Sequence, residues 1–157
     1  MADTEAIDRL TAAKTGERQT ARAYLLDDQI GFLLRRANQR HLGIFNSYMP
    51  DGITAQQFAV LVRIDELGET SQNELGRQAA MDQSTINGVV NRLMARGLVK
   101  RAKSARDQRR LLLSLTEAGK EALASFVPIA NEISELTLAP LKERDQKMLI
   151  ELLRKIS

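Results

Sequence analysis

The sequence predicts a mainly α-helical chain with a small β-wing, in which long dimerisation helices from both termini flank a winged helix-turn-helix lobe. Three observations predict this fold. Apolar residues recur at spacings of three and four along most of the chain, two short helical patterns occupy residues 71–97, and a basic hairpin pattern follows at residues 98–115. Two helices joined by a tight turn commonly read the DNA major groove, so the pattern also indicates a DNA-binding protein.

The first third of the chain contains a polar segment and then a long helical pattern. Residues 1–22 are polar, and we expect them to form a flexible extension. The helical pattern runs from Tyr24 to Tyr48 and ends at the breaker sequence Met49-Pro50-Asp51-Gly52. A helix of this length reaches about 37 Å, more than one small lobe needs. We therefore assign residues 23–49 to dimerisation.

Residues 53–115 are predicted to form the winged helix-turn-helix lobe, and capping signals place its first helices. Thr54 with Gln57 three residues later is a capping box, which opens a helix that ends near Gly68. Ser71 with Glu74 is a second capping box at the start of the helix-turn-helix.

The second half of the lobe combines a recognition helix with the wing. Asp82 can cap that helix, and Gly97 suits its C-terminal end because glycine tolerates positive φ. We expect short strands at residues 98–101 and 110–115, with a polar and mostly basic loop at residues 102–109 between them.

Residues 116–157 are predicted to form C-terminal dimerisation helices. Thr116 can cap a long helix, Ala139-Pro140 ends it, and a last helix extends to Ile156. The apolar faces at the two ends of the chain exceed what one small lobe can cover, so we expect a homodimer.

Charge is concentrated on the predicted DNA-binding module. Residues 71–115 contain nine Lys or Arg residues and three acids, giving +6, whereas the whole chain carries +3 and the remainder therefore −3. A basic excess on one module favours a polyanionic partner, here double-stranded DNA.

Composition excludes several other classes of protein. The absence of Cys removes disulfides and thiolate metal sites, and the single His excludes a His-rich metal site within one chain. We find no phosphate-binding Gly-rich loop and no nucleophile motif, so we expect neither an enzyme nor a cofactor or metal. No apolar run is long enough to span a bilayer and no signal peptide is present, so we expect a cytoplasmic protein.

Four local strings, within a match that covers about residues 24 to 156, resemble the MarR family of bacterial regulators. They are TAQQFAVL at residues 54–61, NRLMARGLV at 91–99, RDQRR at 106–110 and LTEAG at 115–119. The wing string with the following Leu-Thr-Glu-x-Gly is the most specific. Family members usually carry an acid two or three residues before the Asp of the wing, whereas this chain has Ser104 and Ala105 there. The wing is therefore more basic than the family pattern.

The resemblance implies a function. Such regulators are homodimers that bind inverted-repeat operators, commonly repress transcription, and release DNA when a small ligand enters a cleft between the dimerisation helices and the winged lobe. The string YLLDDQIGFLLRRANQRH at residues 24–41 is similar to regulators of aromatic-acid catabolism. We therefore expect a repressor of an aromatic-compound catabolic operon, released by an anionic aromatic acid or its CoA thioester.

Candidate DNA contacts lie in the first turns of both helices, near the end of the second helix and on the wing. For the helix residues, capping or solvation is the alternative. The recognition-helix residues suit base edges, and the arginines suit phosphates or the minor groove. Arg109 is the leading minor-groove candidate with Asp107 as its orienter; the alternative is an ion pair on an exposed hairpin. The candidates are Gln72, Asn73, Gln83, Ser84, Thr85, Asn87, Arg92, Arg106, Asp107, Arg109 and Arg110.

Candidate ligand contacts are centred on His41, which shares an apolar stripe with Phe45 and Tyr48. His41 could bond a carboxylate or phenol while a neighbouring arginine supplies charge; a purely structural His is the alternative. The candidates are Arg36, Asn38, Arg40, His41, Phe45, Tyr48 and Phe58.

Two other functions remain open from the sequence. The chain could bind DNA without any small-molecule effector, or its winged helix could serve as a protein-interaction module. A ligand screen separates the first from the expected regulator, and sequence-blind DNA binding would identify the second.

Overall fold

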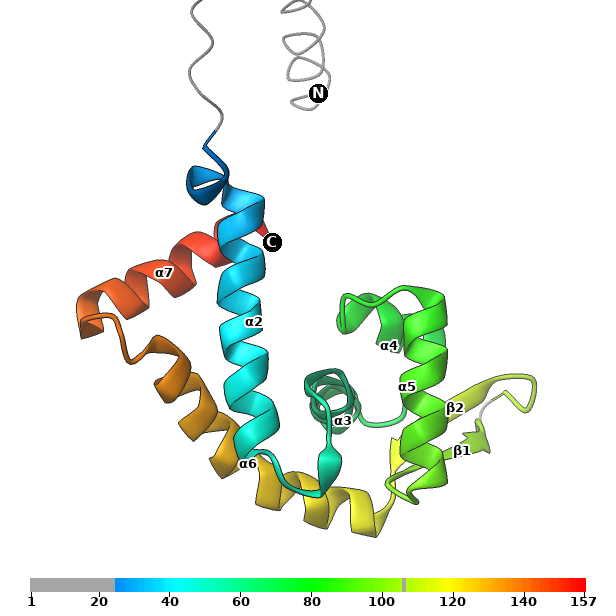
Figure 1. Cartoon of the computed structure of the whole chain (residues 1–157). Helices are drawn as coiled ribbons and strands as arrows, with labels where there is room; N and C mark the ends of the chain where they lie inside the picture. Colours follow the sequence, from blue (N-terminus) through cyan, green and yellow to red (C-terminus); the bar gives the residue numbers. More distant parts are fainter. Residues whose placement is uncertain (1–24, 106) are drawn as a thin grey trace, which may run out of the picture. The chain divides into compact units, whose positions relative to one another are not determined.

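Among the described residues, helices predominate and there is one two-stranded antiparallel sheet (Figure 1). The structure is a computed structural model that describes residues 25–105 and 107–157. The predicted extension at residues 1–22 and the candidate Arg106 lie outside the described residues. Contacts divide the chain into one unit that ends at Arg35 and a second that begins at Arg36.

The helix that links the two units begins later than the sequence predicted. A 3₁₀ turn, η1 (Leu26–Asp28), comes first, and α2 runs from Ile30 to Tyr48. Gln29 separates them because its backbone is extended, with φ −83° and ψ 127°, and its carbonyl accepts the N–H of Leu33 at 2.9 Å. The predicted uninterrupted helix from Tyr24 is therefore wrong at its N-terminal end.

In the second unit, α2 ends in the breaker sequence that the chain places there. A 3₁₀ turn, η2 (Pro50–Gly52), follows, in which Asp51 and Gly52 adopt φ values of 59° and 63°. On either side of this turn the side chains of Met49 and Ile53 are buried in the core. The sharp reversal thus lets both ends of the turn contribute to packing.

Helix α3 (Ala55–Leu67) is the centre of the second unit. The predicted capping box is confirmed: Thr54 Oγ1 accepts the Gln57 N–H at 3.2 Å, and Gln57 Oε1 accepts the Thr54 N–H at 3.0 Å. The helix contacts α4, α5, β2 and α6, and its Val60, Leu61 and Ile64 are almost completely buried. Burial of such aliphatic side chains is the main stabilising contribution here, at roughly 1.5–3 kcal/mol each.

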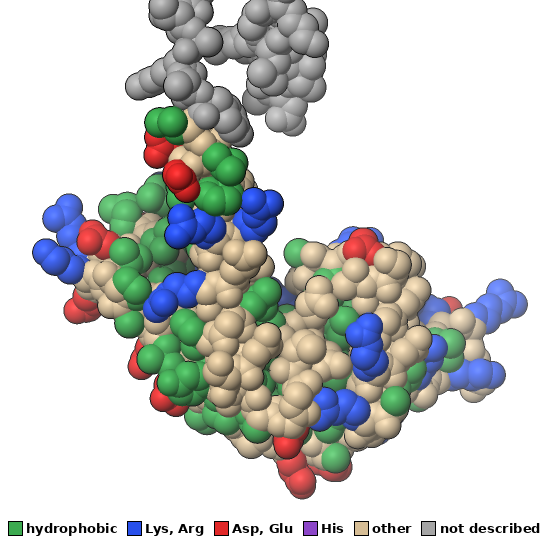
Figure 2. All heavy atoms as spheres, in the orientation of Figure 1, with side chains coloured by type: hydrophobic (Ala, Val, Ile, Leu, Met, Phe, Trp, Pro, Cys, Tyr) green, Lys and Arg blue, Asp and Glu red, His purple; other side chains and the backbone are tan. Residues whose placement is uncertain are grey.

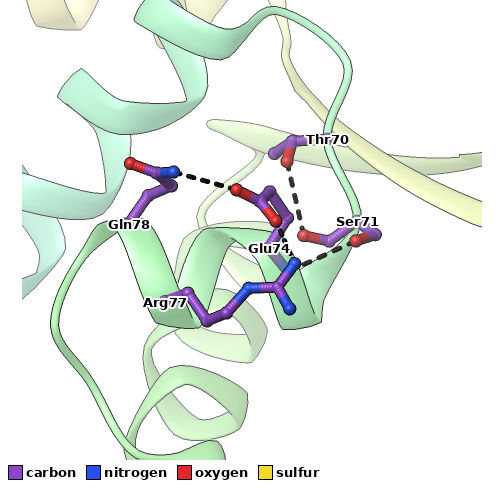
Figure 3. Close-up of polar contacts among 5 residues, drawn as sticks. All are labelled: Thr70, Ser71, Glu74, Arg77 and Gln78. Atoms are coloured by element: carbon purple, nitrogen blue, oxygen red, sulfur yellow. Dashed lines mark hydrogen bonds and ion pairs between the residues drawn. The ribbon is translucent and has the colours of Figure 1, made fainter.

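The helix-turn-helix consists of α4 (Gln72–Gln78) and α5 (Gln83–Ala95), as expected. Ser71 caps α4 by accepting the Glu74 N–H at 3.3 Å, but the reciprocal half of the predicted capping box is wrong. Figure 3 shows the Glu74 carboxylate turned instead towards Arg77 and Gln78 on its own helix. A cation one turn away offers this carboxylate a stronger partner than a backbone N–H does.

The wing forms from β1 (Val99–Lys103) and β2 (Leu111–Leu115). Val99 lies opposite Leu115 and Lys103 opposite Leu111, so the ladder begins and ends within one or two residues of the predicted strands. Thr70 adds a bridge outside the hairpin, because it exchanges two backbone hydrogen bonds with Leu113, of 3.0 and 2.8 Å. The wing is therefore tied directly to the residue before the helix-turn-helix.

The C-terminal third contains α6 (Glu117–Leu138) and α7 (Glu143–Ile156). Thr116 caps α6 as predicted, accepting the Gly119 N–H at 3.0 Å, and the helix continues through Pro128. Helix α7 is strongly amphipathic, yet none of its residues is buried in the single chain. None of the helices in the described part of the chain has the length and apolarity of a membrane span.

Candidate DNA interface and ligand cleft

The N-terminus of α5 is organised by the carboxylate of Asp82. It accepts the backbone N–H groups of Ser84 and Thr85, both at 2.9 Å, and their hydroxyls at 2.6 and 2.7 Å. These hydroxyl donors hold the pKa of Asp82 well below its usual range. Because each hydroxyl has a single hydrogen and donates it to Asp82, the two oxygens have only acceptor capacity left for a base or a water.

Three further DNA-contact candidates are joined by hydrogen bonds on the exposed face of the module. The Asn87 side-chain oxygen accepts from the amide of Gln72 and, at 3.3 Å, from the amide of Gln83. Gln72 in turn accepts from the Arg101 guanidinium, with Nη2 and Oε1 2.7 Å apart. Arg101 was not among the candidates predicted from sequence, because only the register of the folded wing brings β1 to the start of α4.

The wing tip is shaped by Asp107 through the backbone. Its carboxylate accepts the Arg109 N–H at 3.0 Å, and its carbonyl accepts the Arg110 N–H at 3.0 Å. Asp107 thus binds the main chain of Arg109, whereas the sequence suggested a bond to the guanidinium. Arg109 and Arg110 are exposed, and Figure 2 shows Lys and Arg side chains projecting from the hairpin end of the lobe.

The remaining DNA candidates, Asn73 and Arg92, are exposed on α4 and α5. Arg96, one turn after Arg92, has a structural partner instead: its guanidinium donates to the Asp51 carbonyl at 2.7 Å. This bond fixes the C-terminal end of the recognition helix to the η2 turn.

An open cleft of about 630 Å³ lies between α2, the start of α3 and the helix-turn-helix. Two of the predicted ligand contacts, Asn38 and His41, line it. The others that line it were not predicted: Leu42, Asn46, Thr54, Ala55, Gln56, Ala59 and Met81. They come from separate segments whose proximity only the fold establishes, so no local sequence signal could have identified them.

His41 joins the cleft to α6. Its Nδ1 lies 3.0 Å from Thr137 Oγ1, and the Thr137 hydroxyl donates its own hydrogen to the Ile133 carbonyl at 2.8 Å. The hydroxyl can therefore only accept from the ring, which places a hydrogen on His41 Nδ1. In neutral His41, Nε2 is then an acceptor and is the ring nitrogen left to meet a ligand.

The five other predicted ligand residues do not line the cleft. Phe45 and Phe58 pack behind it, in a chain of tilted rings that starts at His41, with successive centroids 6.1 Å apart. Arg40 donates to the Leu136 carbonyl at 3.1 Å, and Tyr48 is 48% exposed. Arg36 is exposed on α2 outside the cleft lining.

Comparison with known proteins identifies the family. A model of the MarR family matches residues 53–111, which span α3, the helix-turn-helix and most of the wing. The transcriptional repressor NicR of Pseudomonas putida is 40% identical over 134 residues, with 85% of both chains covered. The chain belongs to the MarR family. It is a transcriptional regulator and not an enzyme, as the sequence predicted.

Solved structures confirm the winged helix-turn-helix fold of this MarR-family chain. A probable transcriptional regulator from Pseudomonas aeruginosa is 47% identical with a TM-score of 0.82, covering 85% of this chain and 100% of that one. BpsR of Bordetella bronchiseptica is 37% identical with a TM-score of 0.80, covering 85% and 96%. The BpsR structure is described as showing how 6-hydroxynicotinic acid regulates DNA binding.

Proposed function

We propose that this MarR-family chain is a cytoplasmic repressor of an aromatic-compound catabolic operon, which binds an inverted-repeat operator as a homodimer and is released by an anionic aromatic acid. The observation that carries the proposal is the cleft beside His41, which lies between α2 and the DNA-binding lobe. The repressor NicR supports repression, and the regulation of BpsR by 6-hydroxynicotinic acid supports an aromatic-acid effector.

The size and lining of the cleft suit a single substituted ring. Its volume of about 630 Å³ falls within the range of about 300–1,000 Å³ of small-molecule sites. Leu42, Ala59 and Met81 supply apolar surface for a ring, while the amides of Asn38, Asn46 and Gln56 supply donors for a carboxylate.

His41 adds a polar contact whose direction is set by Thr137. Neutral His41 presents an acceptor at Nε2 and so favours a hydroxyl or ring N–H of the ligand, as a hydroxypyridine acid carries. Protonated His41 instead donates to a carboxylate. No Lys or Arg belongs to the described lining of this cleft, so neutral donors and His41 are the groups that meet the ligand's charge.

Release follows from where the cleft lies. A ligand in it contacts α2 on one side and, on the other, the start of α3 and Met81, which directly precedes the recognition-helix cap Asp82. A ligand that fits one placement of the lobe better than the DNA-bound placement shifts the population towards release. Each tenfold preference contributes about 1.4 kcal/mol to that shift.

A homodimer would place two recognition helices on the two half-sites. Helix α7 supplies unpartnered apolar surface, since Met148, Leu152 and Ile156 are 47%, 49% and 67% exposed. Leu25, Leu26 and Ile30 are exposed at the other end of the described chain. Both predicted dimerisation segments therefore carry apolar surface that a second copy would cover.

The experiment is a selection of randomised duplex DNA by the full chain, followed by titration of the selected duplex with aromatic acids and their CoA thioesters. The proposal requires an enriched inverted repeat, one dimer per duplex, and weaker binding when an acid such as 6-hydroxynicotinic acid is added. Sequence-blind binding would favour the protein-interaction module. Specific binding that no acid or thioester alters would identify a regulator without an effector of this class.

A further inference from the structure

Three side chains of the DNA-binding module form a relay whose hydrogen-bonding direction is fixed at one end. Arg101 on β1 donates to Gln72 on α4, and Gln72 donates to Asn87 on the recognition helix. Residues from three elements thus meet on the exposed face of the lobe. Nothing in the packing of the core requires this relay, because Asn87 and Arg101 are exposed.

The chemistry of arginine sets the direction. A guanidinium has donors and no acceptor, so Gln72 must present its Oε1 to Arg101. The Gln72 Nε2 group then faces Asn87 as a donor, so Asn87 must present Oδ1 as the acceptor. Gln83 also donates to this oxygen, at 3.3 Å, so both lone pairs of Asn87 Oδ1 are occupied within the protein. A reversed Asn87 amide would place donors against donors.

We infer that Gln72 and Arg101 are positioning residues that make Asn87 a donor-only reader, so that Asn87 selects guanine or thymine over adenine at one position of each half-site. An asparagine with a free amide pairs with adenine through both its oxygen and its nitrogen. Here the oxygen is occupied, and only the Nδ2 hydrogens are available. Guanine presents two acceptors in the major groove and thymine presents one, whereas adenine presents a donor beside its acceptor.

This inference rests on the proposed function, since it requires that the chain read DNA. It goes further by assigning a base class to one side chain. It also gives a role to Arg101 that is neither phosphate contact nor folding. Because the direction of the relay follows from the donors of Arg101, a lysine at that position would preserve it and an apolar side chain would not.

The test uses the full chain and the duplex that the wild type selects, with every half-site position changed in turn and affinities measured by fluorescence anisotropy. Asn87→Ala locates the position, as the one where discrimination is lost. We expect guanine or thymine there, with adenine bound roughly tenfold or more weakly by the wild type. Gln72→Met and Arg101→Met should reduce that preference to about twofold or less, and Arg101→Lys should restore it.

Gln72→Glu gives the sharpest comparison, because a carboxylate only accepts. It keeps a partner for Arg101 but requires Asn87 to turn its amide nitrogen inwards, which exposes Oδ1 and should favour adenine or cytosine. Gln78→Met is the matched control, because Gln78 lies on the same helix, donates to Glu74 outside the relay, and is not a candidate DNA contact; it should leave the preference unchanged. The inference would be overturned, and the proposed function would stand, if the wild type preferred adenine or cytosine at the position that Asn87→Ala locates. A preference unchanged in both Gln72 variants would have the same consequence. No enriched sequence would overturn it together with the proposed function.

Discussion

Gly119 of α6 lies directly against the backbone of Leu98: a Cβ added to Gly119 would be 2.0 Å from the Leu98 carbonyl oxygen. The same carbonyl accepts the Thr116 N–H at 3.0 Å, so it cannot move away without losing that bond. This contact fixes the start of α6 against the residue that leads into β1. The start of α6 is therefore fixed in position relative to the wing.

We predict that Gly119→Ala destabilises the protein by about 2–3 kcal/mol, because the clash is with backbone and not with a flexible side chain. Urea denaturation measures the change. Gly43→Ala is the control, since a Cβ there meets nothing within 4 Å and alanine favours a helix by roughly 0.5–1 kcal/mol. Equal stability of the two variants would contradict the close approach at Gly119.

Asp82→Ala should lower the melting temperature at pH 7, because Asp82 caps the recognition helix through four hydrogen bonds. The folded state depresses the pKa of Asp82, so its contribution is complete above the unfolded value near 3.8 and is lost as the pH falls below that value. The gap between wild type and Asp82→Ala should therefore begin to narrow near about pH 4 and continue to narrow as the pH falls towards about 2. A gap that is constant over this range would mean that the ionised carboxylate is not the cap.

Thr137→Val should impair the ligand response more than DNA binding. Without the hydroxyl, His41 Nδ1–H loses its acceptor and the ring is no longer held in one orientation towards the cleft. We expect about tenfold more ligand to be needed for half-release, equivalent to about 1.4 kcal/mol. Ser134→Ala on the same helix is the matched control, since the Ser134 hydroxyl donates only to the Ala130 carbonyl. If both variants needed the same ligand concentration for half-release, the orientation of His41 by Thr137 would not contribute to ligand binding.

Arg109→Ala should weaken binding to the selected operator and reduce the slope of log affinity against log salt by about one. The side chain is exposed at the wing tip, so a contact with DNA would need no rearrangement of the fold. Gln108→Ala, the adjacent exposed residue, should leave the slope unchanged. Unaltered affinity in Arg109→Ala would show that the wing tip does not contact the operator.

Local signals predicted the elements of the fold well. The caps at Thr54, Asp82 and Thr116 and the positive φ at Gly97 are confirmed, because each depends on a few neighbouring residues. The two errors in the predicted elements occur where the backbone or side chain of one residue adopts a different local arrangement from the predicted one. Gln29 adopts an extended backbone and delays α2, and Glu74 turns from the capping box to Arg77.

The candidate site was less predictable because its members are distant in sequence. The cleft combines His41 with Asn46, Gln56 and Met81, and no periodicity relates these positions to one another. Likewise, Arg101 meets Gln72 only because the wing folds back on the helix-turn-helix. Residue type identified Asn38 and His41 as polar groups on a helix. Which side chains line the cleft depends on how α2, α3 and the helix-turn-helix pack together.

The most direct test of the account compares ligand-induced release by the wild type and by Ala59→Leu. Ala59 lines the cleft, so a leucine there fills part of the ligand's space without touching the DNA-binding surface. The account predicts that 6-hydroxynicotinic acid or a related aromatic acid lowers wild-type operator affinity about tenfold or more, whereas Ala59→Leu binds the operator normally and responds weakly. Equal release of both proteins, or an operator affinity that no aromatic acid changes in the wild type, would contradict it.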